Sequence, residues 1–365
     1  MSDYSDFDLP DLVVTITSGK SGKLHIWLPA VRAGSGADVF TMRLAAALDR
    51  RGLEATITWF PHWSELTPDV LRFVKPPAGT DLIHANSAYA FAFKRKGIPL
   101  VVTEHHYTLD PVYRPYKSAV QNVYHKALVG PCLRRSYAAA DAITTDSLFT
   151  ARVLAERAGV RTTRTIPLWA DYDEFSPLDG AQHVARRNHH FRLLFVGNSS
   201  RRKGADVIPL LAKRLGEGFE ICCTAGLRQH KHAEQVGNMS MLGRLTLRQL
   251  VQEYRNCDAV LVPSRYEGFG YSALEAMACA KPVVGFRCGA IEEVVAEAQT
   301  GLLCDIDDID ALEANCKLLA NNYAEVERLG LAGRERATQN FAESKAIDSY
   351  LEVYRSLVSR TNGEV

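Results

Sequence analysis

Two glutamates flank a glycine-rich turn and form the most chemically suggestive pattern in the chain. The stretch reads Glu267-Gly-Phe-Gly-Tyr-Ser-Ala-Leu-Glu275, and the apolar run 259–262 precedes it. An apolar run, a glycine turn and a helical pattern together predict a strand–turn–helix unit. Backbone N–H groups at the start of such a helix favour a phosphate, and carboxylates accept hydrogen bonds from sugar hydroxyls. The combination is typical of a nucleotide-sugar site.

Histidine and glycine residues mark the ends of other predicted strands. His105 follows the apolar run 98–103, at the end of a strand where open α/β sheets bind their ligands. Gly34-Ser-Gly36 follows the run 23–28. Because a lone G-x-G is also an ordinary strand-to-helix turn, the glycine pair alone predicts no ligand. A dinucleotide fold is disfavoured, because Val39 stands where a third glycine is required.

The elements that must position these residues alternate between strands and helices. A first series of apolar runs lies at 23–28, 53–60, 81–85, 98–103 and 141–145, with 12–17 as a further strand or an N-terminal extension. A second series lies at 192–196, 220–224, 239–242, 258–262, 282–286 and 301–304. Such alternation predicts parallel sheets covered on both faces. The polar segment 171–188 between the two series is interpreted as an interdomain linker.

Composition narrows the class of protein. A chain of 365 residues is too long for one typical core, and a net charge of +1 gives no general attraction to nucleic acid. The polar, acidic start 1–11 lacks the features of a signal peptide. The sequence contains no run of about 18 apolar residues, so no membrane span is predicted. The eight cysteines contain no C-x-x-C pair, which favours reduced, packed thiols in a cytoplasmic protein and disfavours a zinc site.

Several motifs in order resemble the family-4 retaining glycosyltransferases. They are Gly34 to Leu48 with Arg51-Gly52, Val102-Thr-Glu-His105, Phe195-Val-Gly197 with Lys203-Gly204, Pro263-Ser264 to Glu275, Lys281-Pro-Val-Val284, and Gly289 to Val295 with Thr300-Gly-Leu-Leu303. The resemblance covers nearly the whole chain and implies the GT-B fold, an α/β architecture of two Rossmann-like domains facing across a cleft. It implies an acceptor-side domain over 1–172 and a nucleotide-sugar-binding domain over 190–343. The terminal helix, 344–360, is expected to pack back onto the first domain.

The resemblance also implies roles for the residues of the glycine turn. Glu267 would contact hydroxyls of the donor sugar, and the backbone N–H groups of Phe269, Gly270 and Tyr271 would lie near the diphosphate or the sugar. Glu275 would bind the ribose hydroxyls. The two glutamates are therefore expected to grip opposite ends of one donor rather than to move protons.

Further roles follow from the other matched motifs. Lys203 would neutralise the donor diphosphate, and Gly34 and Gly36 would approach the donor phosphate and the acceptor. His105 would contact a sugar hydroxyl rather than act as a general base. The family usually has an arginine directly after the strand glycine, where this chain has Asn198. Arg201 or Arg202 could supply the missing charge, and we favour Arg202.

A basic segment, 111–137, interleaves cations with tyrosines and contains no acidic residue. It is a candidate contact with an anionic membrane face, at the inner side of the plasma membrane, or with a lipid-linked acceptor. A solvated helix face is the alternative. No metal is expected, because the four D-x-D triplets, which begin at Asp6, Asp171, Asp305 and Asp308, lack a supporting strand end.

These observations predict a metal-independent hexosyltransferase that needs no cofactor and uses a nucleotide-diphosphate sugar as co-substrate. The expected acceptor is a glycan or a lipid-linked saccharide, in the synthesis of a surface polysaccharide or glycoconjugate. A nucleotide-sugar epimerase, a sugar phosphorylase and a catalytically silent binding protein of the same fold remain alternatives.

Overall fold

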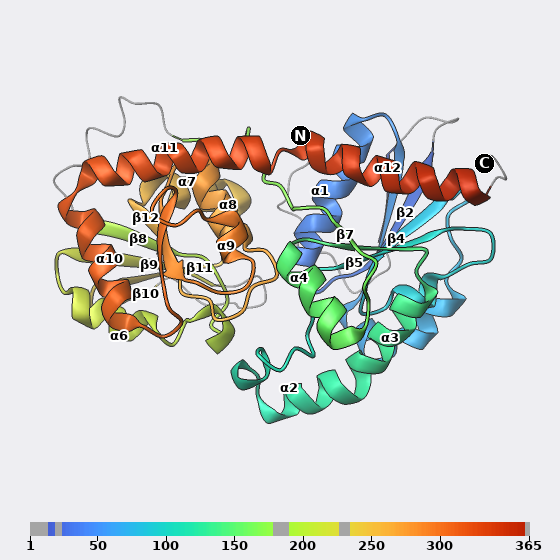
Figure 1. Cartoon of the computed structure of the whole chain (residues 1–365), viewed down its shortest axis with the longest axis horizontal. Helices are drawn as coiled ribbons and strands as arrows, with labels where there is room; N and C mark the ends of the chain where they lie inside the picture. Colours follow the sequence, from blue (N-terminus) through green and yellow to red (C-terminus); the bar gives the residue numbers. More distant parts are fainter. Residues whose placement is uncertain (1–13, 19–23, 178–189, 226–233, 362–365) are drawn as a thin grey trace. The chain divides into compact units, whose positions relative to one another are not determined.

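The chain folds into two compact units, each shown in Figure 1. The computed structural model describes residues 14–18, 24–177, 190–225 and 234–361. The N-terminal unit holds the described residues up to Arg114, then Ser118–Leu168 and the segment from Glu343; the C-terminal unit holds Trp169–Ala342 and the short segment Pro115–Lys117. Of the predicted linker, 178–188 lies outside the described residues, as does the triplet that begins at Asp6.

The N-terminal unit is built on a sheet whose strand order is β1-β3-β2-β4-β5-β6-β7. The strands are β1 (Val14–Ser18), β2 (His25–Val31), β3 (Glu54–Phe60), β4 (Leu82–Asn86), β5 (Leu100–Glu104), β6 (Ala142–Thr145) and β7 (Arg164–Thr165). Only β1 is antiparallel to its neighbour. The helices are α1 (Gly36–Arg50), α2 (Ala119–Tyr124), α3 (Gly130–Ala139), α4 (Leu148–Val153) and α12 (Glu343–Thr361). The strand order reverses between β2 and β4, which places a ligand crevice at their carboxyl ends.

Helix α12 belongs to the N-terminal unit although it is the last element of the chain. Its apolar stripe buries Ile347, Tyr350 and Tyr354. The Tyr354 hydroxyl is hydrogen-bonded to Nδ1 of His84 on β4, at 2.6 Å. At the start of the helix, Arg50 at the end of α1 donates to Glu343 at 2.5 Å. The helix is therefore held by burial along its length and by an ion pair at its first residue.

The C-terminal unit has a second sheet, with strand order β10-β11-β9-β8-β12-β13-β14. The strands are β8 (Phe191–Phe195), β9 (Phe219–Thr224), β10 (Glu234–Val236), β11 (Met239–Gly243), β12 (Ala259–Val262), β13 (Val283–Phe286) and β14 (Gly301–Cys304). The helices are α6 (Ile208–Leu215), α7 (Leu247–Asn256), α8 (Tyr271–Ala278), α9 (Ile291–Val294), α10 (Ile309–Asn321) and α11 (Tyr323–Asn340). Here the order reverses between β8 and β12, so a second crevice is expected where these two strands end.

The predicted α/β fold class is confirmed, with local differences; the two-residue strand β7 at the edge of the first sheet was not predicted. Strand β10 was not predicted, because its residues are all exposed and carry no apolar pattern; it pairs antiparallel with β11 at the edge of the sheet. The adjacent Cys222 and Cys223 on β9 are both buried. Successive side chains on a strand point to opposite faces, so both faces of β9 are covered. All eight cysteines are free and buried.

Candidate functional site

Two of the predicted donor residues in the C-terminal unit, Lys203 and Arg202, meet at the carboxylate of a third, Glu267. Lys203 Nζ donates to Glu267 Oε1 at 2.5 Å, and Arg202 Nη1 donates to Oε2 at 3.3 Å. Ser264 Oγ also donates to Oε1, at 2.8 Å. The other candidate cation, Arg201, has a side chain that is 70% exposed and lies 3.9 Å from Asp206. Arg202 is thus the arginine that the fold places beside Lys203.

The two loops that carry these residues leave neighbouring parallel strands. One follows β8 and the other follows β12, which pairs with β8 at the reversal of strand order. Gly204 allows the loops to touch, because its φ is +74° and a Cβ there would lie 2.0 Å from the carbonyl oxygen of Pro263. The backbone N–H of Arg265 also donates to the carbonyl oxygen of Arg202, at 2.8 Å. Backbone packing therefore sets the positions of the two cations.

Charge governs the protonation of Glu267. Burial alone would raise its pKa, but the nearby charges of Lys203 and Arg202 and the hydrogen bonds from Lys203 and Ser264 lower the pKa to about 2. The cluster then holds two cations against one carboxylate. The side chain of Lys203 is 18% exposed, that of Arg202 19% and that of Glu267 7%. A partly buried site with one excess positive charge can take an anion such as a phosphate.

The turn after Glu267 leads into helix α8, which begins at Tyr271. Gly270 occupies the position before the helix with φ +107°, and no side chain caps the helix start. Phe269 packs its ring against Phe341, so only its backbone can serve a ligand at the turn. Glu275 lies in the second turn of α8 and accepts a 3.1 Å hydrogen bond from the hydroxyl of Tyr254 on α7. Tyr254 is fully buried, so it fixes one oxygen of Glu275.

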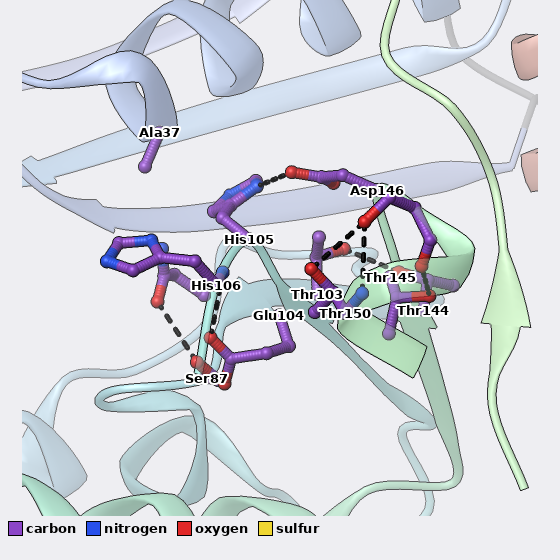
Figure 2. A network of polar contacts seen from close by, with 12 residues as sticks. Ala37, Ser87, Thr103, Glu104, His105, His106, Thr144, Thr145, Asp146 and Thr150 are labelled. Atoms are coloured by element: carbon purple, nitrogen blue, oxygen red, sulfur yellow. Dashed lines mark hydrogen bonds and ion pairs between the residues drawn. The ribbon is translucent and has the colours of Figure 1, made fainter. Parts of the chain in front are cut away.

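In the N-terminal unit, His105 follows β5 and is held by a carboxylate from the neighbouring strand. Its Nδ1 lies 2.7 Å from Oδ2 of Asp146, which follows β6 (Figure 2). The Asp146 side chain is 2% exposed and that of His105 is 15% exposed. Burial acts to lower the pKa of His105, but the charges of Asp146, Glu104 and Asp38 raise it above its ordinary value.

Glu104 points away from Asp146, toward Ser87 (Figure 2). It accepts hydrogen bonds from the Tyr137 hydroxyl at 2.5 Å and from the backbone N–H of His106 at 3.2 Å. Burial raises the pKa of Glu104, and these hydrogen bonds oppose the rise. Tyr137, counted among the tyrosines of the basic segment, therefore faces the end of β5 rather than the surface.

The glycine loop after β2 lies close to His105. Gly36 begins helix α1, and Asp38 in its first turn accepts hydrogen bonds from the backbone N–H groups of Ala33 and Gly34, at 3.2 and 2.7 Å. A small cavity opens beside this helix; it is lined by Leu28, Pro29, Phe40, Thr41, Leu44, His84, Ala85, Asn86 and His105. Of the predicted residues His105 lines this cavity, whereas Gly34 and Gly36 lie in the loop and first turn just before the lining residues Phe40 and Thr41.

Neither a metal site nor a membrane helix emerges in the described part of the chain. Among these residues, no group of three or more His, Cys, Asp or Glu side chains is placed to hold a metal ion. The acidic triplets have other partners: Asp307 accepts from Arg265, Asp308 caps α10 and Asp310 pairs with Arg214. Within the same residues, no helix is long and apolar enough to cross a bilayer.

Sequence reasoning missed the residues that hold the site in place. Asp146 lies 41 positions from His105 and Tyr254 lies 21 positions from Glu275, so neither belongs to a local motif. The position of Asp146 directly after an apolar strand offered a signal, because parallel strands deliver their following residues to one edge of the sheet. Tyr254 offered none, since an aromatic residue on an amphipathic helix predicts only core packing.

Comparison with known families agrees with this geometry. Residues 60–174 match the family described as Glycosyltransferase Family 4, and residues 182–336 match Glycosyl transferases group 1. The chain is 29% identical over 344 residues to alpha-maltose-1-phosphate synthase of Mycolicibacterium smegmatis, with 84% of this chain and 85% of that protein covered. It is 31% identical over 170 residues to an uncharacterized glycosyltransferase of Methanocaldococcus jannaschii, where it spans about half of that protein, 48%.

Solved structures show the same architecture. Sucrose-phosphate synthase from Thermosynechococcus elongatus matches with a TM-score of 0.78 at 20% identity, over 93% of this chain and 100% of that one. Anabaena HepE in complex with UDP-glucose matches with a TM-score of 0.71 at 16% identity, over 91% and 100%. The family and fold predicted from the motifs are confirmed: this chain belongs to the group 1, family 4 glycosyltransferases and has the GT-B fold.

Proposed function

We propose that this protein is a retaining hexosyltransferase that moves a sugar from a nucleotide diphosphate to a saccharide or lipid-linked acceptor. The contact of Lys203 and Arg202 with Glu267 carries the proposal. Leaving-group departure requires charge stabilisation at the diphosphate, and fixed cations in a partly buried site provide it. Family membership and the UDP-glucose bound by Anabaena HepE support a nucleotide sugar as donor.

Each predicted residue has a role in this proposal. Lys203 and Arg202 turn from Glu267 to the diphosphate oxygens, and the backbone at Phe269, Gly270 and Tyr271 borders the same group. Glu267 then accepts hydrogen bonds from hydroxyls of the donor sugar, while Glu275 accepts them from the ribose. Gly34 and Gly36 have no side chains and let the backbone approach the donor phosphate and the acceptor closely. His105 binds a sugar hydroxyl. Transfer proceeds without a metal ion.

The basic segment supports an acceptor at an anionic surface. Within 111–137, Val112, Val120 and Val123 are 54%, 78% and 67% exposed, and Arg114, Lys126 and Arg134 are exposed close by in sequence. Exposed apolar side chains among cations favour an anionic lipid face. Arg135 does not belong to this surface, since it pairs with Asp69 and its guanidinium lies 3.7 Å from the ring centre of Phe91.

A liposome experiment tests the lipid contact. Charge reversal at Lys126 and Arg134 should reduce co-sedimentation with vesicles that contain phosphatidylglycerol, and reversal at the exposed Lys96 serves as the matched control. Equal binding of both variants to the vesicles would contradict the proposed membrane contact and would leave the proposed transferase activity untouched.

A product assay tests the transferase itself. The protein is incubated with UDP-, GDP- and ADP-sugars, with and without saccharide acceptors, in buffer that contains EDTA. A transferase releases the nucleoside diphosphate and forms a glycoside of retained anomeric configuration. An epimerase would interconvert the sugar without an acceptor, a phosphorylase would require inorganic phosphate, and a silent binding protein would leave every donor intact. Activity that is lost in EDTA and restored by Mn²⁺ would contradict the metal-free mechanism.

A further inference from the structure

Two histidines on neighbouring strands of the N-terminal unit have opposite environments. His84 on β4 is bonded through Nδ1 to the Tyr354 hydroxyl and through Nε2 to Thr103 Oγ1, both at 2.6 Å. Burial, with a smaller effect from His105, lowers the pKa of His84 to about 3. Its ring therefore stays neutral, with both nitrogens used inside the fold. His105 uses one nitrogen only, and its partner is a carboxylate.

The ring of His105 is fixed in one orientation. Its centre lies 4.9 Å from that of Phe40 in an edge-to-face arrangement, and Asp146 holds Nδ1 (Figure 2). Within the described part of the chain, Nε2 has no hydrogen-bond partner, and the ring lines the small cavity together with Thr41 and Asn86. The free nitrogen is thus the one available to a ligand.

The protonation state of His105 decides what that nitrogen can do. A neutral ring with its proton on Nδ1 presents a lone pair at Nε2 and acts as a base, whereas a protonated ring presents an N–H donor. The charged and titratable groups around it are Asp146 after β6, Glu104 on β5, Asp38 on α1 and His84 on β4. Three of the four are carboxylic acids, and their charges favour the protonated ring over the opposing effect of burial.

Burial of the Asp146 carboxylate costs free energy that packing alone does not offset. It is 2% exposed, and its second oxygen, Oδ1, has no hydrogen-bond partner among the described residues. A buried carboxylate oxygen without a donor destabilises a fold. The hydrogen bond to His105 is the one side-chain contact of its carboxylate in the described structure.

We propose that Asp146 is a positioning residue that holds His105 as a charge-balanced hydrogen-bond donor, whose Nε2–H binds a hydroxyl oxygen of the transferred sugar. The inference deepens the proposed function and rests on it for the identity of the ligand. The imidazolium–carboxylate pair is neutral overall, so it offers a strong donor without adding net positive charge beside a sugar that itself becomes electron-poor during transfer. As a hydrogen-bond donor, His105 takes up no proton during transfer.

The first test follows the ring directly, without substrate. NMR of the full chain labelled with [¹³Cε1]histidine gives eleven signals, and His105→Gln identifies the one of interest. In the wild type, we expect His105 to titrate above an ordinary histidine. Asp146→Asn, which is isosteric and checked for folding by circular dichroism, should lower the midpoint by about 1–3 pH units. Asp69→Asn, which breaks an exposed ion pair with Arg135, should leave the midpoint unchanged.

The second test uses the pH profile of kcat/KM with UDP-glucose as the probe. A donor requires the protonated ring, so activity should fall as pH rises through the midpoint of His105, and Asp146→Asn should move that fall to lower pH. Activity that rises through the same midpoint would show a base and overturn the inference, as would a His105 titration that Asp146→Asn leaves in place. UDP-glucose could be neither bound nor turned over while Asp146→Asn still shifts the titration of His105. That result would support Asp146 as the residue that positions His105 and would contradict the sugar as the ligand of His105.

Discussion

The two units both place polar clusters at the carboxyl ends of sheet strands but with opposite charge balance. In the C-terminal unit, two cations from the loop after β8 meet one carboxylate from the loop after β12. In the N-terminal unit, the imidazole of His105 is surrounded by the carboxyl groups of Asp146, Glu104 and Asp38. The C-terminal cluster lies where the strand order reverses between β8 and β12, whereas His105 and Asp146 follow β5 and β6, beside the reversal between β2 and β4. Strand ends of two similar sheets thus support two different electrostatic environments.

This difference assigns different ligands to the two clusters. Excess positive charge suits a diphosphate, which is the part of a nucleotide sugar that must be held and then released. A neutral donor pair suits a hydroxyl group, which carries no charge to balance. The account therefore predicts that changes in the C-terminal cluster affect turnover most, and that changes in the N-terminal cluster affect its pH dependence.

The largest effect is expected from removal of a C-terminal cation. Lys203→Ala should lower kcat by about 100- to 1,000-fold, because it removes a fixed charge from the leaving diphosphate. Turnover of a nucleotide sugar by the purified variant is the measurement. Lys213→Ala, at an exposed position on α6 of the same unit, is the matched control and should keep wild-type turnover. Near-wild-type turnover by Lys203→Ala would remove the proposed distinction between the units.

The next effect concerns stability in acid. The pKa of Glu267 lies at about 2 in the folded protein, below its ordinary value of 4.5. Its ionisation thus stabilises the fold above pH 4.5, by about 3 kcal/mol, and this contribution disappears as pH falls toward 2. Glu267→Gln should lower the melting temperature at pH 6, and the difference from wild type should shrink with acidification below pH 4.5.

The N-terminal pair should respond with the opposite sign. Because the pKa of His105 is raised, its contribution is complete below the ordinary histidine pKa and is lost as pH rises through the raised value. Burial also raises the pKa of Asp146, so the pair is complete only between the titrations of Asp146 and His105. Asp146→Asn should therefore destabilise the protein most in that interval, and less at higher and at lower pH. A difference from wild type that is constant with pH for both variants would show that neither cluster is held by charge.

The smallest effect is expected at Tyr254. Tyr254→Phe removes the 3.1 Å hydrogen bond to Glu275 and leaves the packing of the ring in place. A single hydrogen bond of this kind is worth about 1 kcal/mol, or roughly 5-fold in affinity. If Glu275 grips the ribose, the loss should appear for a ribonucleoside diphosphate and be much smaller for its 2′-deoxy analogue. An equal loss for both nucleotides would indicate a packing role alone.

The sequence predicted much of this arrangement, but unevenly. Glu267, Lys203 and Glu275 sit in local motifs with glycines at fixed offsets, and a strand–turn–helix pattern specifies such geometry over short distances. The strand ends that carry His105 and Gly34 followed from the apolar runs. Family and fold were predictable because the motifs recur in order along nearly the whole chain.

The partners of these residues were not predictable in the same way. Tertiary packing across strands and helices brings Asp146 and Tyr254 to their partners. A single sequence, taken without an alignment, does not reveal such pairs. Arg135 and Tyr137 show the same limit in the basic, aromatic segment 111–137: Arg135 is 37% exposed but is paired with Asp69, and Tyr137 points at Glu104. Composition alone does not tell which face of a helix is buried.

We propose that Lys203 and Arg202 form a diphosphate site beside Glu267. Isothermal titration of wild type, Lys203→Ala and Lys213→Ala with UDP, GDP and ADP and with the matching monophosphates tests it directly. We expect one diphosphate to bind the wild type and the Lys213→Ala variant more tightly than its monophosphate, and Lys203→Ala to lose most of this difference. An undiminished preference for the diphosphate in Lys203→Ala, or no nucleotide binding by the wild type, would contradict it.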